Sequence, residues 1–409
     1  MEIADTVIVG GGAAGLMAAW SAARRGGRVV LLEGGSRIGR KILISGNGRC
    51  NLTNRSADAP EHYHSGRPRF VIAALRCLPV ARTLDLFGEL GIETREEKRG
   101  RLFPLSDQAQ AVIDVLLDRL ALVGVEVVTD AKVCSLARDE VFRLATVSGR
   151  RWRAGRVVLA SGGVSLPKLG ADRSGIDLAV SLGHTCTELW PGLVPLVSAD
   201  PFVRRMQGVK VWAEVSAPLE RGQTAKDTDD LLFTPYGLSG FTVLNLSARL
   251  VPLLARGPRP LHIGLFPGRT PEQVSEVLRA RWERNPHRSL AVSFSGLLSS
   301  KLVVPFLERW GLPAQQRVDR LSRAQRWHLA QALTCWPVEV SGPRSFAHAE
   351  VTVGGIRTEE VDPETLESRR VPGLYLAGEM LDVQGDLGGY NFQWAWSSGY
   401  LAGQGLGSP

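Results

Sequence analysis

Six residues near the N-terminus, Gly10-Gly11-Gly12-Ala13-Ala14-Gly15, constrain the fold of this chain more than any other segment. They follow an apolar run at 5–10 and open an Ala-rich segment at 13–25, and a second apolar run at 28–32 ends at Glu33. Strand, glycine turn, helix and strand in this order predict a parallel β-α-β unit. The glycines match GxGxxG, in which the first allows a tight turn, the second lets the backbone approach a pyrophosphate, and the third allows close packing of helix and strand.

The turn predicts a dinucleotide site. The start of a helix offers unpaired N–H groups and a partial positive charge to phosphates. Glu33 lies 18 residues after Gly15, where an acid would accept hydrogen bonds from the hydroxyls of an adenosine ribose. The candidate cofactor site therefore contains Gly10, Gly12, Ala13, Ala14, Gly15 and Glu33.

FAD and NAD share this fingerprint, so other segments must decide between them. A second glycine-ended strand, GLYLAGE at 373–379, lies near the C-terminus, where flavoproteins with such a unit place the segment that closes over the ribityl and pyrophosphate. A further apolar run at 157–160 leads into Ser161-Gly162-Gly163, which adds Gly162 to the candidate site. The chain has no second GxGxxG unit, so a separate nicotinamide domain is not expected. FAD is the predicted cofactor.

Composition sets wider limits. The 409 residues, of which 44% are hydrophobic and 22% charged, suit a soluble protein of two or three domains. No run of about 18 apolar residues occurs, and no basic segment precedes an apolar one at the start, so we expect a cytoplasmic protein without a membrane span. The five cysteines are scattered without a CxxC pair, and neither zinc nor another metal is predicted.

Segments of different character divide the chain. Weaker strands are expected at 125–128 and 132–136, and a closing helix at 390–404. Short strand-like runs broken by Pro and Gly fill 193–266, whereas 271–332 is helical in pattern and rich in Arg. We predict an α/β FAD-binding domain made of 1–190 and 340–409, interrupted by a β-rich domain at 191–267 and a helical Arg-rich region at 268–339.

The net charge of +8 is unevenly placed. Residues 269–330 hold ten Arg and one Lys against four Glu and one Asp. This segment is expected to form a basic surface that binds an anionic small molecule or, as the less favoured partner, a nucleic acid.

Several longer motifs resemble one family. The chain is similar to the BaiN-like, or YhiN-type, family of NAD(P)/FAD-dependent oxidoreductases, and the resemblance covers nearly its whole length. It rests on SGNGRCNLTN (45–54), ASGGVSLPKLG (160–170), LFTPYGLSG (232–240), AEVTVGGI (349–356) and GLYLAGEMLDVQGDLGGYNFQWAWSSGYLAG (373–403).

The resemblance implies a Rossmann-type, glutathione-reductase-like FAD domain assembled from both ends of the chain, with an inserted β-barrel-like region and a small helical region. It implies that Arg40 and Lys41 neutralise the pyrophosphate or hold the edge of the isoalloxazine, and that Val133 offers backbone groups to adenine. The further residues that it places around FAD are Gly378, Glu379, Gly388, Gly389, Tyr390, Asn391 and Phe392.

The start of the closing helix is expected to serve the flavin. If the chain enters this helix as the resemblance implies, its first free N–H groups face the pyrimidine edge of the isoalloxazine. A side chain at Gly389 would then hold the ring away from the backbone. The sequence departs from the family pattern at 170–175 and at Phe233-Thr234-Pro235, which leaves substrate recognition open.

The predicted activity is that of an FAD-dependent oxidoreductase acting on a small molecule, with NADH or NADPH as the candidate diffusible donor. No catalytic acid or base stands out. Cys50 lies beside Arg49, which could lower the pKa of a thiol, but packing is the favoured role. His184, His328 and His348 lack partners in the sequence pattern, so structural roles are expected. The alternatives are an RNA-associated flavoprotein and a flavin sensor without turnover.

Overall fold

The computed structural model describes residues 1–405 and divides into two compact units. The first unit contains Met1–Trp190 and the chain from Val351 onward, and the second contains Pro191–Glu350. Short strands β11 (Trp190–Gly192) and β19 (Val351–Val353) lie where the chain passes between the units. No helix within residues 1–405 is both long and apolar enough to cross a membrane.

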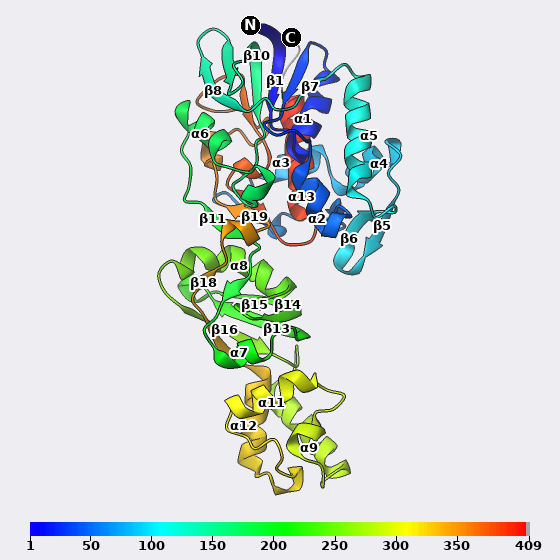
Figure 1. Ribbon diagram of the computed structural model, residues 1–409, viewed down its shortest axis with the longest axis vertical. Helices are drawn as coiled ribbons and strands as arrows, with labels where there is room; N and C mark the ends of the chain where they lie inside the picture. The colour runs from blue at the N-terminus through cyan, green and yellow to red at the C-terminus, as the bar shows by residue number, and fades with distance from the viewer. Residues whose placement is uncertain (406–409) are drawn as a thin grey trace. The chain divides into compact units, whose positions relative to one another are not determined.

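The first unit is built on a mainly parallel sheet (Figure 1). Strand β1 pairs in parallel with β2 on one side and with β10 on the other, and β10 also pairs in parallel with β20. Antiparallel β9 and β8 follow β10, and β7 completes the opposite edge. The predicted runs at 5–10 and 28–32 thus become neighbouring buried strands, as expected for apolar runs in a parallel sheet. Their bounds are β1 (Glu2–Val9), β2 (Val29–Leu32), β7 (Glu126–Val128), β8 (Val133–Arg138), β9 (Phe142–Thr146), β10 (Arg151–Leu159) and β20 (Leu374–Leu376).

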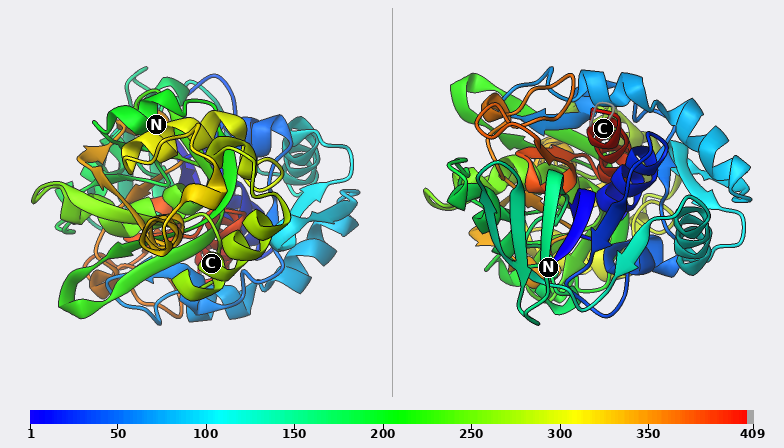
Figure 2. Two further views of the ribbon diagram at one scale, coloured as in Figure 1. Left: turned by 90° about the horizontal axis from the view of Figure 1, so that it is seen from below. Right: turned by 90° about the horizontal axis from the view of Figure 1, so that it is seen from above.

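Two helices from opposite ends of the chain pack side by side against this sheet, α1 (Ala13–Ala23) and α13 (Tyr390–Gln404) (Figures 1 and 2). Small residues allow the approach. A Cβ on Gly399 would lie 2.1 Å from the Ala14 carbonyl oxygen, and one on Gly403 would lie 2.5 Å from that of Ala18. Because residue numbers rise together along the contact, the helices run in the same direction.

The rest of the first unit surrounds this centre. Strands β3, β6 and β5 form one small antiparallel sheet, and β21 pairs with β4 in another. The bounds are α2 (Arg40–Gly48), β3 (Thr53–Asn54), β4 (Tyr63–Ser65), α3 (Ile72–Cys77), α4 (Val80–Glu89), β5 (Thr94–Glu97), β6 (Arg101–Pro104), α5 (Ala109–Leu122), α6 (Ser174–Ser181) and β21 (Val383–Gly385).

The second unit contains a seven-stranded sheet in the order β17-β16-β13-β14-β15-β12-β18. The sheet curves back on itself, because Ser198 beside β12 donates its hydroxyl to the carbonyl of Glu339 in β17, and the Ser341 N–H donates to the Val197 carbonyl. This barrel-like region extends beyond the predicted bounds of 191–267, because β17 and β18, at 336–343, belong to the same sheet. Its elements are β12 (Leu196–Val197), α7 (Pro201–Arg205), β13 (Lys210–Pro218), β14 (Thr224–Thr234), β15 (Gly237–Ser239), α8 (Phe241–Leu254), β16 (Arg259–Gly264), β17 (Trp336–Val340) and β18 (Gly342–Pro343).

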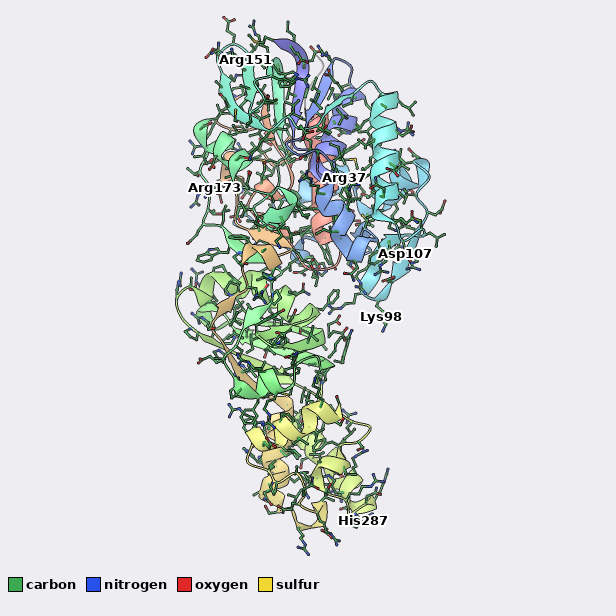
Figure 3. All side chains as sticks on the ribbon, viewed as in Figure 1. Arg37, Lys98, Asp107, Arg151, Arg173 and His287 are labelled. Carbon is green, nitrogen blue, oxygen red and sulfur yellow. The ribbon has the colours of Figure 1, made fainter. Side chains whose placement is uncertain are left out.

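Four helices fill the Arg-rich stretch of this unit: α9 (Pro271–Arg284), α10 (Leu290–Ser293), α11 (Ser300–Arg309) and α12 (Arg323–Thr334). Thr270 and Ser322 begin α9 and α12 with capping boxes, which satisfy N–H groups at each helix start. The two helices pack through their apolar faces, on which Leu278 and Leu329 are buried. His287 is exposed in the loop after α9 (Figure 3).

Candidate functional site

The glycine turn leaves open space in front of α1. Gly10 has φ +108°, and a Cβ on Gly15 would lie 1.8 Å from the Gly10 carbonyl oxygen, so neither position accepts a side chain. Gly12 is the N-cap of α1, and a Cβ there would meet no atom within 4 Å. The N–H groups of the first helical turn, from Ala13 and Ala14 onward, have no partner within the helix. Open space before free N–H groups fits a pyrophosphate.

Glu33 is held firmly beside this turn. Its two carboxylate oxygens accept hydrogen bonds from the N–H groups of Gly11 and Gly35, each at 2.8 Å. Each oxygen keeps a further lone pair, so the carboxylate can still accept from ribose hydroxyls. The Ala131 N–H donates to the Glu33 carbonyl, and this contact brings the start of β8 with Val133 beside the predicted adenosine site.

Arg40 lies at the start of α2 without a carboxylate partner among residues 1–405. Its guanidinium makes only long hydrogen bonds of 3.4 Å, to the Leu169 carbonyl and the Ser36 hydroxyl. A guanidinium held this loosely keeps donors for a phosphate.

Lys41 and Glu379 form an ion pair, with 2.8 Å between Nζ and Oε2. The Glu379 carboxylate also accepts from the Thr352 N–H at 2.8 Å and the Ser165 hydroxyl at 3.1 Å. Burial alone would raise the pKa of Glu379, but the Lys41 ammonium and these donors outweigh burial and hold that pKa below its usual value. Gly162, which follows β10 with φ +78°, faces the same carboxylate.

The C-terminal glycines join the two helices to the rest of the site. Gly378 has φ +75°; its N–H donates to the Ser398 hydroxyl, and its carbonyl accepts from the Trp394 indole. A Cβ there would lie 2.8 Å from that of Ala14. Gly378 is therefore fixed between α1 and α13.

Gly388 and Gly389 come directly before α13, and Gly389 is its N-cap with φ +108°. A Cβ on Gly389 would lie 2.4 Å from the Thr53 carbonyl oxygen. The expectation that a side chain here would meet the flavin first is therefore wrong, because the backbone of β3 already fills that space. At Gly388 a Cβ would make only ordinary contacts of 3.6 Å or more.

The side chains that follow face the protein. The Asn391 amide binds the N–H and carbonyl of Gly385, each at 2.8 Å. The Phe392 ring stacks on Trp396, and the Tyr390 ring packs against His62. These three residues can therefore offer a ligand the backbone N–H groups of the helix start, while their side chains hold that start in place.

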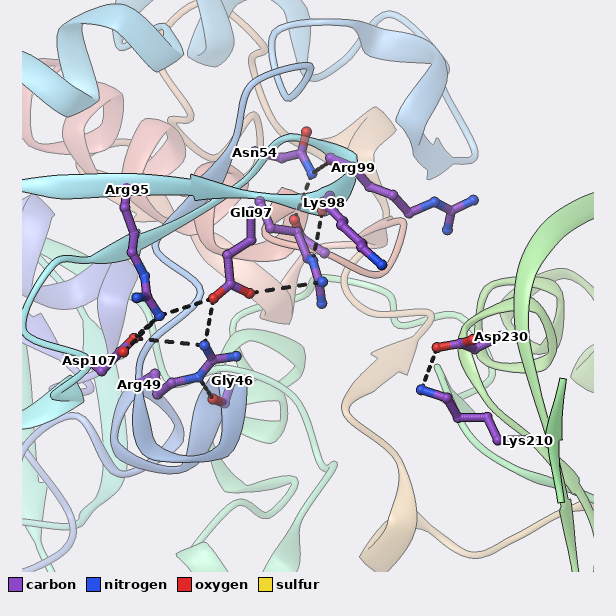
Figure 4. A network of polar contacts seen from close by, with 12 residues as sticks. Gly46, Arg49, Asn54, Arg95, Glu97, Lys98, Arg99, Asp107, Lys210 and Asp230 are labelled. Atoms are coloured by element: carbon purple, nitrogen blue, oxygen red, sulfur yellow. Dashed lines mark hydrogen bonds and ion pairs between the residues drawn. The ribbon is translucent and has the colours of Figure 1, made fainter. Parts of the chain in front are cut away.

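A polar network holds the hairpin of β5 and β6 in place (Figure 4). The Asn54 amide donates to the carbonyls of both Gly388 and Arg99 at 2.9 Å. At the same turn, Glu97, the last residue of β5, accepts from Arg49 at 2.7 Å and from Arg95 at 3.1 Å. The hairpin is thereby tied to the loop that leads into α13.

Cys50 is fully buried, and burial raises the pKa of its thiol to about 12. The neighbouring Arg49 instead pairs with Glu97 and lies over the Phe103 ring. A thiol in such surroundings remains protonated near neutral pH and is a poor nucleophile.

We therefore expect Cys50→Ser to retain FAD and to leave the rate of flavin reduction by any effective donor unchanged within about twofold. The substitution keeps a side chain of similar size and replaces the sulfur by oxygen. Stopped-flow absorbance of the flavin measures this rate. A charge-transfer band that disappears in the variant would contradict this prediction.

His184 has two hydrogen-bonding partners, whereas the sequence pattern indicated none. Its ring contacts the Glu360 carboxylate at 3.0 Å and the Ser368 hydroxyl at 2.8 Å, and burial lowers its pKa. The ring joins the end of α6 to the C-terminal part of the chain. His328 packs edge-on against Trp310, and His348 contacts Arg344.

Sequence reasoning missed a cluster of three residues, His62, His64 and Asp386. Both imidazoles contact the one carboxylate at 2.9 Å. The only signal in the sequence was the spacing of two, which places both histidines on one face of an extended segment. The carboxylate comes from more than 320 positions away.

Comparisons with known proteins agree with this architecture. The family described as HI0933-like protein Rossmann domain matches residues 4–405. The chain is 38% identical to a 3-dehydro-bile acid delta(4,6)-reductase of Clostridium scindens, over 97% of each chain. It is 36% identical to a ribosomal RNA dihydrouridine synthase of Escherichia coli, over 99% of this chain and 98% of the relative.

A solved 3-ketosteroid delta1-dehydrogenase of Sterolibacterium denitrificans has a similar fold, with a TM-score of 0.54, 13% identity and coverage of 98% of this chain and 99% of that one. The resemblance to the BaiN-like family, the Rossmann-type fold and FAD as cofactor are confirmed. The chain therefore belongs to the HI0933-like family and is an FAD-dependent oxidoreductase.

Proposed function

We propose that this protein adds hydride to a carbon–carbon double bond conjugated to a carbonyl, with NADH or NADPH as the donor and a small molecule as the acceptor. The names of the two relatives share this chemistry. A delta(4,6)-reductase of a 3-dehydro-bile acid saturates double bonds conjugated to a 3-keto group. A dihydrouridine synthase saturates the double bond of uracil that is conjugated to its carbonyl. When bound, FAD supplies the hydride.

The observation that carries this proposal is the start of α13, where Gly388 and Gly389 precede free helical N–H groups. Gly399 of α13 packs on Ala14, in the first turn of α1. Tyr390, the first residue of α13, comes nine residues before Gly399, so α13 begins about 13 Å before α1 along their common direction. Two helix starts with this offset suit a cofactor whose pyrophosphate and isoalloxazine are separated by a ribityl chain.

We assign the parts of FAD accordingly. Glu33 and Val133 take the adenosine, and the turn at Gly10–Gly15 together with Arg40 takes the pyrophosphate. Lys41, Glu379 and the glycine turns at 162 and 378 take the ribityl chain, and the start of α13 takes the pyrimidine edge. Positive charge and donors at that edge stabilise the negative charge that reduction places there.

We also propose a cytoplasmic location.

A spectrum under anaerobic conditions tests the activity. The purified protein is expected to be yellow and to release FAD on heating, and NADH or NADPH should bleach it. A 3-keto-4,6-diene steroid, as the probe acceptor, should then restore the yellow colour with loss of its own conjugated absorbance. If neither NADH nor NADPH reduces the flavin, the proposed donor is wrong. A reduced flavin that no conjugated ketone or uracil reoxidises would refute the reaction.

A second candidate acceptor, uracil in RNA, is favoured by the distribution of charge. The second unit holds 20 Lys and Arg against 13 Asp and Glu, whereas the first holds 29 against 28. Four exposed arginines in the helical part make no side-chain hydrogen bond or ion pair within residues 1–405: Arg269, Arg284, Arg320 and Arg323. Unpaired arginines suit a polyanion better than a single small anion.

If RNA is the substrate, we expect the triple variant Arg284→Gln, Arg320→Gln, Arg323→Gln to lower the magnitude of the slope of log binding constant against log salt by about 2 to 3. Each lost phosphate contact removes about 0.7 to 0.9. Unmodified ribosomal RNA is the probe. Arg279→Gln is the matched control, because Glu276 and Glu283 already neutralise Arg279. Equal slopes for the triple variant and the unchanged protein would exclude this surface as the RNA site.

A further inference from the structure

The cluster of His62, His64 and Asp386 has no role in the assignment of FAD above. His62 ends a short 3-10 helix (Pro60–His62), and His64 lies in β4, which pairs with β21. Asp386 follows β21 directly and donates its N–H to the His62 carbonyl at 2.9 Å. Its Oδ2 contacts Nδ1 of His62, and its Oδ1 contacts Nε2 of His64, each at 2.9 Å.

The partners fix which nitrogen of each ring carries hydrogen. An ionised carboxylate only accepts, so Nδ1 of His62 and Nε2 of His64 must both be N–H groups. The nitrogens that remain are Nε2 of His62 and Nδ1 of His64. One carboxylate between two imidazoles favours the first added proton, which neutralises the cluster, and disfavours the second, which gives it a positive charge. The cluster therefore holds one mobile proton.

The surroundings of His62 favour its protonated form. The hydrogen bond to Asp386 raises the pKa of His62 against the opposing effect of burial, and the charges of Asp386 and Glu61 act in the same direction. The other titratable groups around the cluster include His64, Tyr63 and Tyr390. Burial raises the pKa of both phenols, that of Tyr390 to about 12, so both stay neutral. Asp386 stays ionised, because bonds from both histidines outweigh its burial and lower its pKa.

The cluster lies at the start of α13. The His62 ring packs on the Tyr390 ring with 4.4 Å between centroids, and Tyr390 is the first residue of the helix. The Asn391 amide binds Gly385 and contacts the Asp386 carbonyl at 3.3 Å, which fixes the loop that carries the carboxylate. The side chain of His62 is 32% exposed, so water can reach it.

We propose that His62 is the proton donor of the reaction, with Asp386 and His64 as its positioning residues. This proposal rests on the proposed function. When hydride adds to the far carbon of the double bond, its electron pair moves to the carbonyl oxygen as an enolate. The carbon next to the carbonyl then takes the proton from Nε2 of His62: that N–H bond breaks and a C–H bond forms. Neutral His62 regains a proton from water.

Two substitutions remove a titrating imidazole but keep a hydrogen-bond donor to Asp386. Asn places an amide nitrogen near the position of Nδ1 of histidine, and Gln places one near that of Nε2. His62→Asn and His64→Gln therefore keep a donor to Asp386 that cannot titrate. We expect His62→Asn to retain FAD and to slow reoxidation of the reduced enzyme by a conjugated acceptor at least about 100-fold, the usual loss when a general acid is removed. His64→Gln should slow it less than about tenfold.

The experiment compares two acceptors for the reduced, FAD-bound enzyme in stopped flow. One is the steroid dienone or unmodified ribosomal RNA, whichever the unchanged protein reduces, and the other is ferricyanide, which takes electrons without needing a proton at carbon. His62→Asn should slow only the first. If the unchanged protein reduces neither conjugated acceptor, the proposed function fails. If it reduces one and His62→Asn does so equally fast, only the role of His62 fails.

A second measurement needs no turnover. Nuclear magnetic resonance titration of the histidines in the FAD-bound protein should place the pKa of His62 above that of free imidazole, and Asp386→Asn should lower it. The same variant should move the fall in reoxidation rate at high pH to lower pH, because the acid then loses its proton earlier. An unchanged His62 pKa in Asp386→Asn, or an unchanged rate profile, would overturn the proposal even if His62→Asn failed to fold.

Discussion

Gly15→Ala is expected to abolish FAD retention by disrupting the fold, whereas Gly12→Ala should lose FAD while keeping the fold. A Cβ on Gly15 would lie 1.8 Å from the Gly10 carbonyl oxygen, and the backbone on both sides is buried between β1 and α1. Relief requires the helix to move off the sheet, at a cost of about 4 kcal/mol or more.

Gly12 differs because its φ of −84° suits any residue and a Cβ would meet no atom within 4 Å. Alanine there should change the free energy of unfolding by about 1 kcal/mol at most, the usual range for an N-cap substitution. The added methyl group would project toward the space that we assign to the pyrophosphate. We expect FAD affinity to fall at least tenfold, or about 1.4 kcal/mol.

Thermal unfolding of the FAD-free protein and fluorescence titration with FAD separate these effects, and each variant is the control for the other. Gly12→Ala should melt near the unchanged protein and bind FAD weakly. Unchanged affinity in Gly12→Ala would place the pyrophosphate elsewhere. A normally stable Gly15→Ala would show that the turn can relax more than its geometry suggests.

Local sequence patterns predicted much of the fold of the first unit. The runs at 5–10 and 28–32 became β1 and β2, and the closing helix has the expected bounds, 390–404. These elements are readable because a buried parallel strand is a continuous apolar run and because glycine ends it at a fixed spacing. The glycine turn concerns neighbours in sequence, so its geometry follows from residue type alone.

Contacts between distant segments could not be read in this way. The reason that Gly389 must be glycine is the Thr53 carbonyl, which lies more than 330 positions away. The resemblance named this glycine without giving that cause. The sequence around Asp386 likewise does not predict its contacts with two histidines. His64 lies in β4 and His62 directly before that strand, far from Asp386 in the chain. Only the pairing of β21 with β4 brings them together.

The ion pair between Lys41 and Glu379 is another long-range contact that the sequence does not predict. Both were predicted to line FAD, but no spacing in the sequence indicates that they pair with each other. Their ion pair joins the start of α2 to the turn after β20, so it links the two ends of the chain on the proposed path of the ribityl group. Such a link holds donors in place before the cofactor binds.

Lys41→Met is expected to lower the free energy of unfolding by about 3 kcal/mol at neutral pH, the lower end of the range for breaking a buried pair. The side chain of Glu379 is only 22% exposed, and the variant leaves its charge with two neutral donors, the Thr352 N–H and the Ser165 hydroxyl. Chemical denaturation of the FAD-free protein measures the loss.

The loss should depend on pH in a defined direction. The folded pKa of Glu379 lies below its usual 4.5, so its contribution is complete above that value and disappears as pH falls through the folded pKa. In Lys41→Met burial is no longer opposed by a cation, so the folded pKa rises above the unfolded one and the carboxylate destabilises the fold as pH increases. The difference between the two proteins should therefore be small in acid and largest at neutral pH.

The double variant Lys41→Met, Glu379→Gln is the matched control. It removes both charges and keeps an amide oxygen to accept from the Thr352 N–H, so it should recover most of the stability that Lys41→Met loses. Its unfolding free energy should also lose the dependence on pH that Glu379 causes. If the double variant is no more stable than Lys41→Met, the loss comes from the packing of the lysine chain and the ion pair does not hold these two segments together.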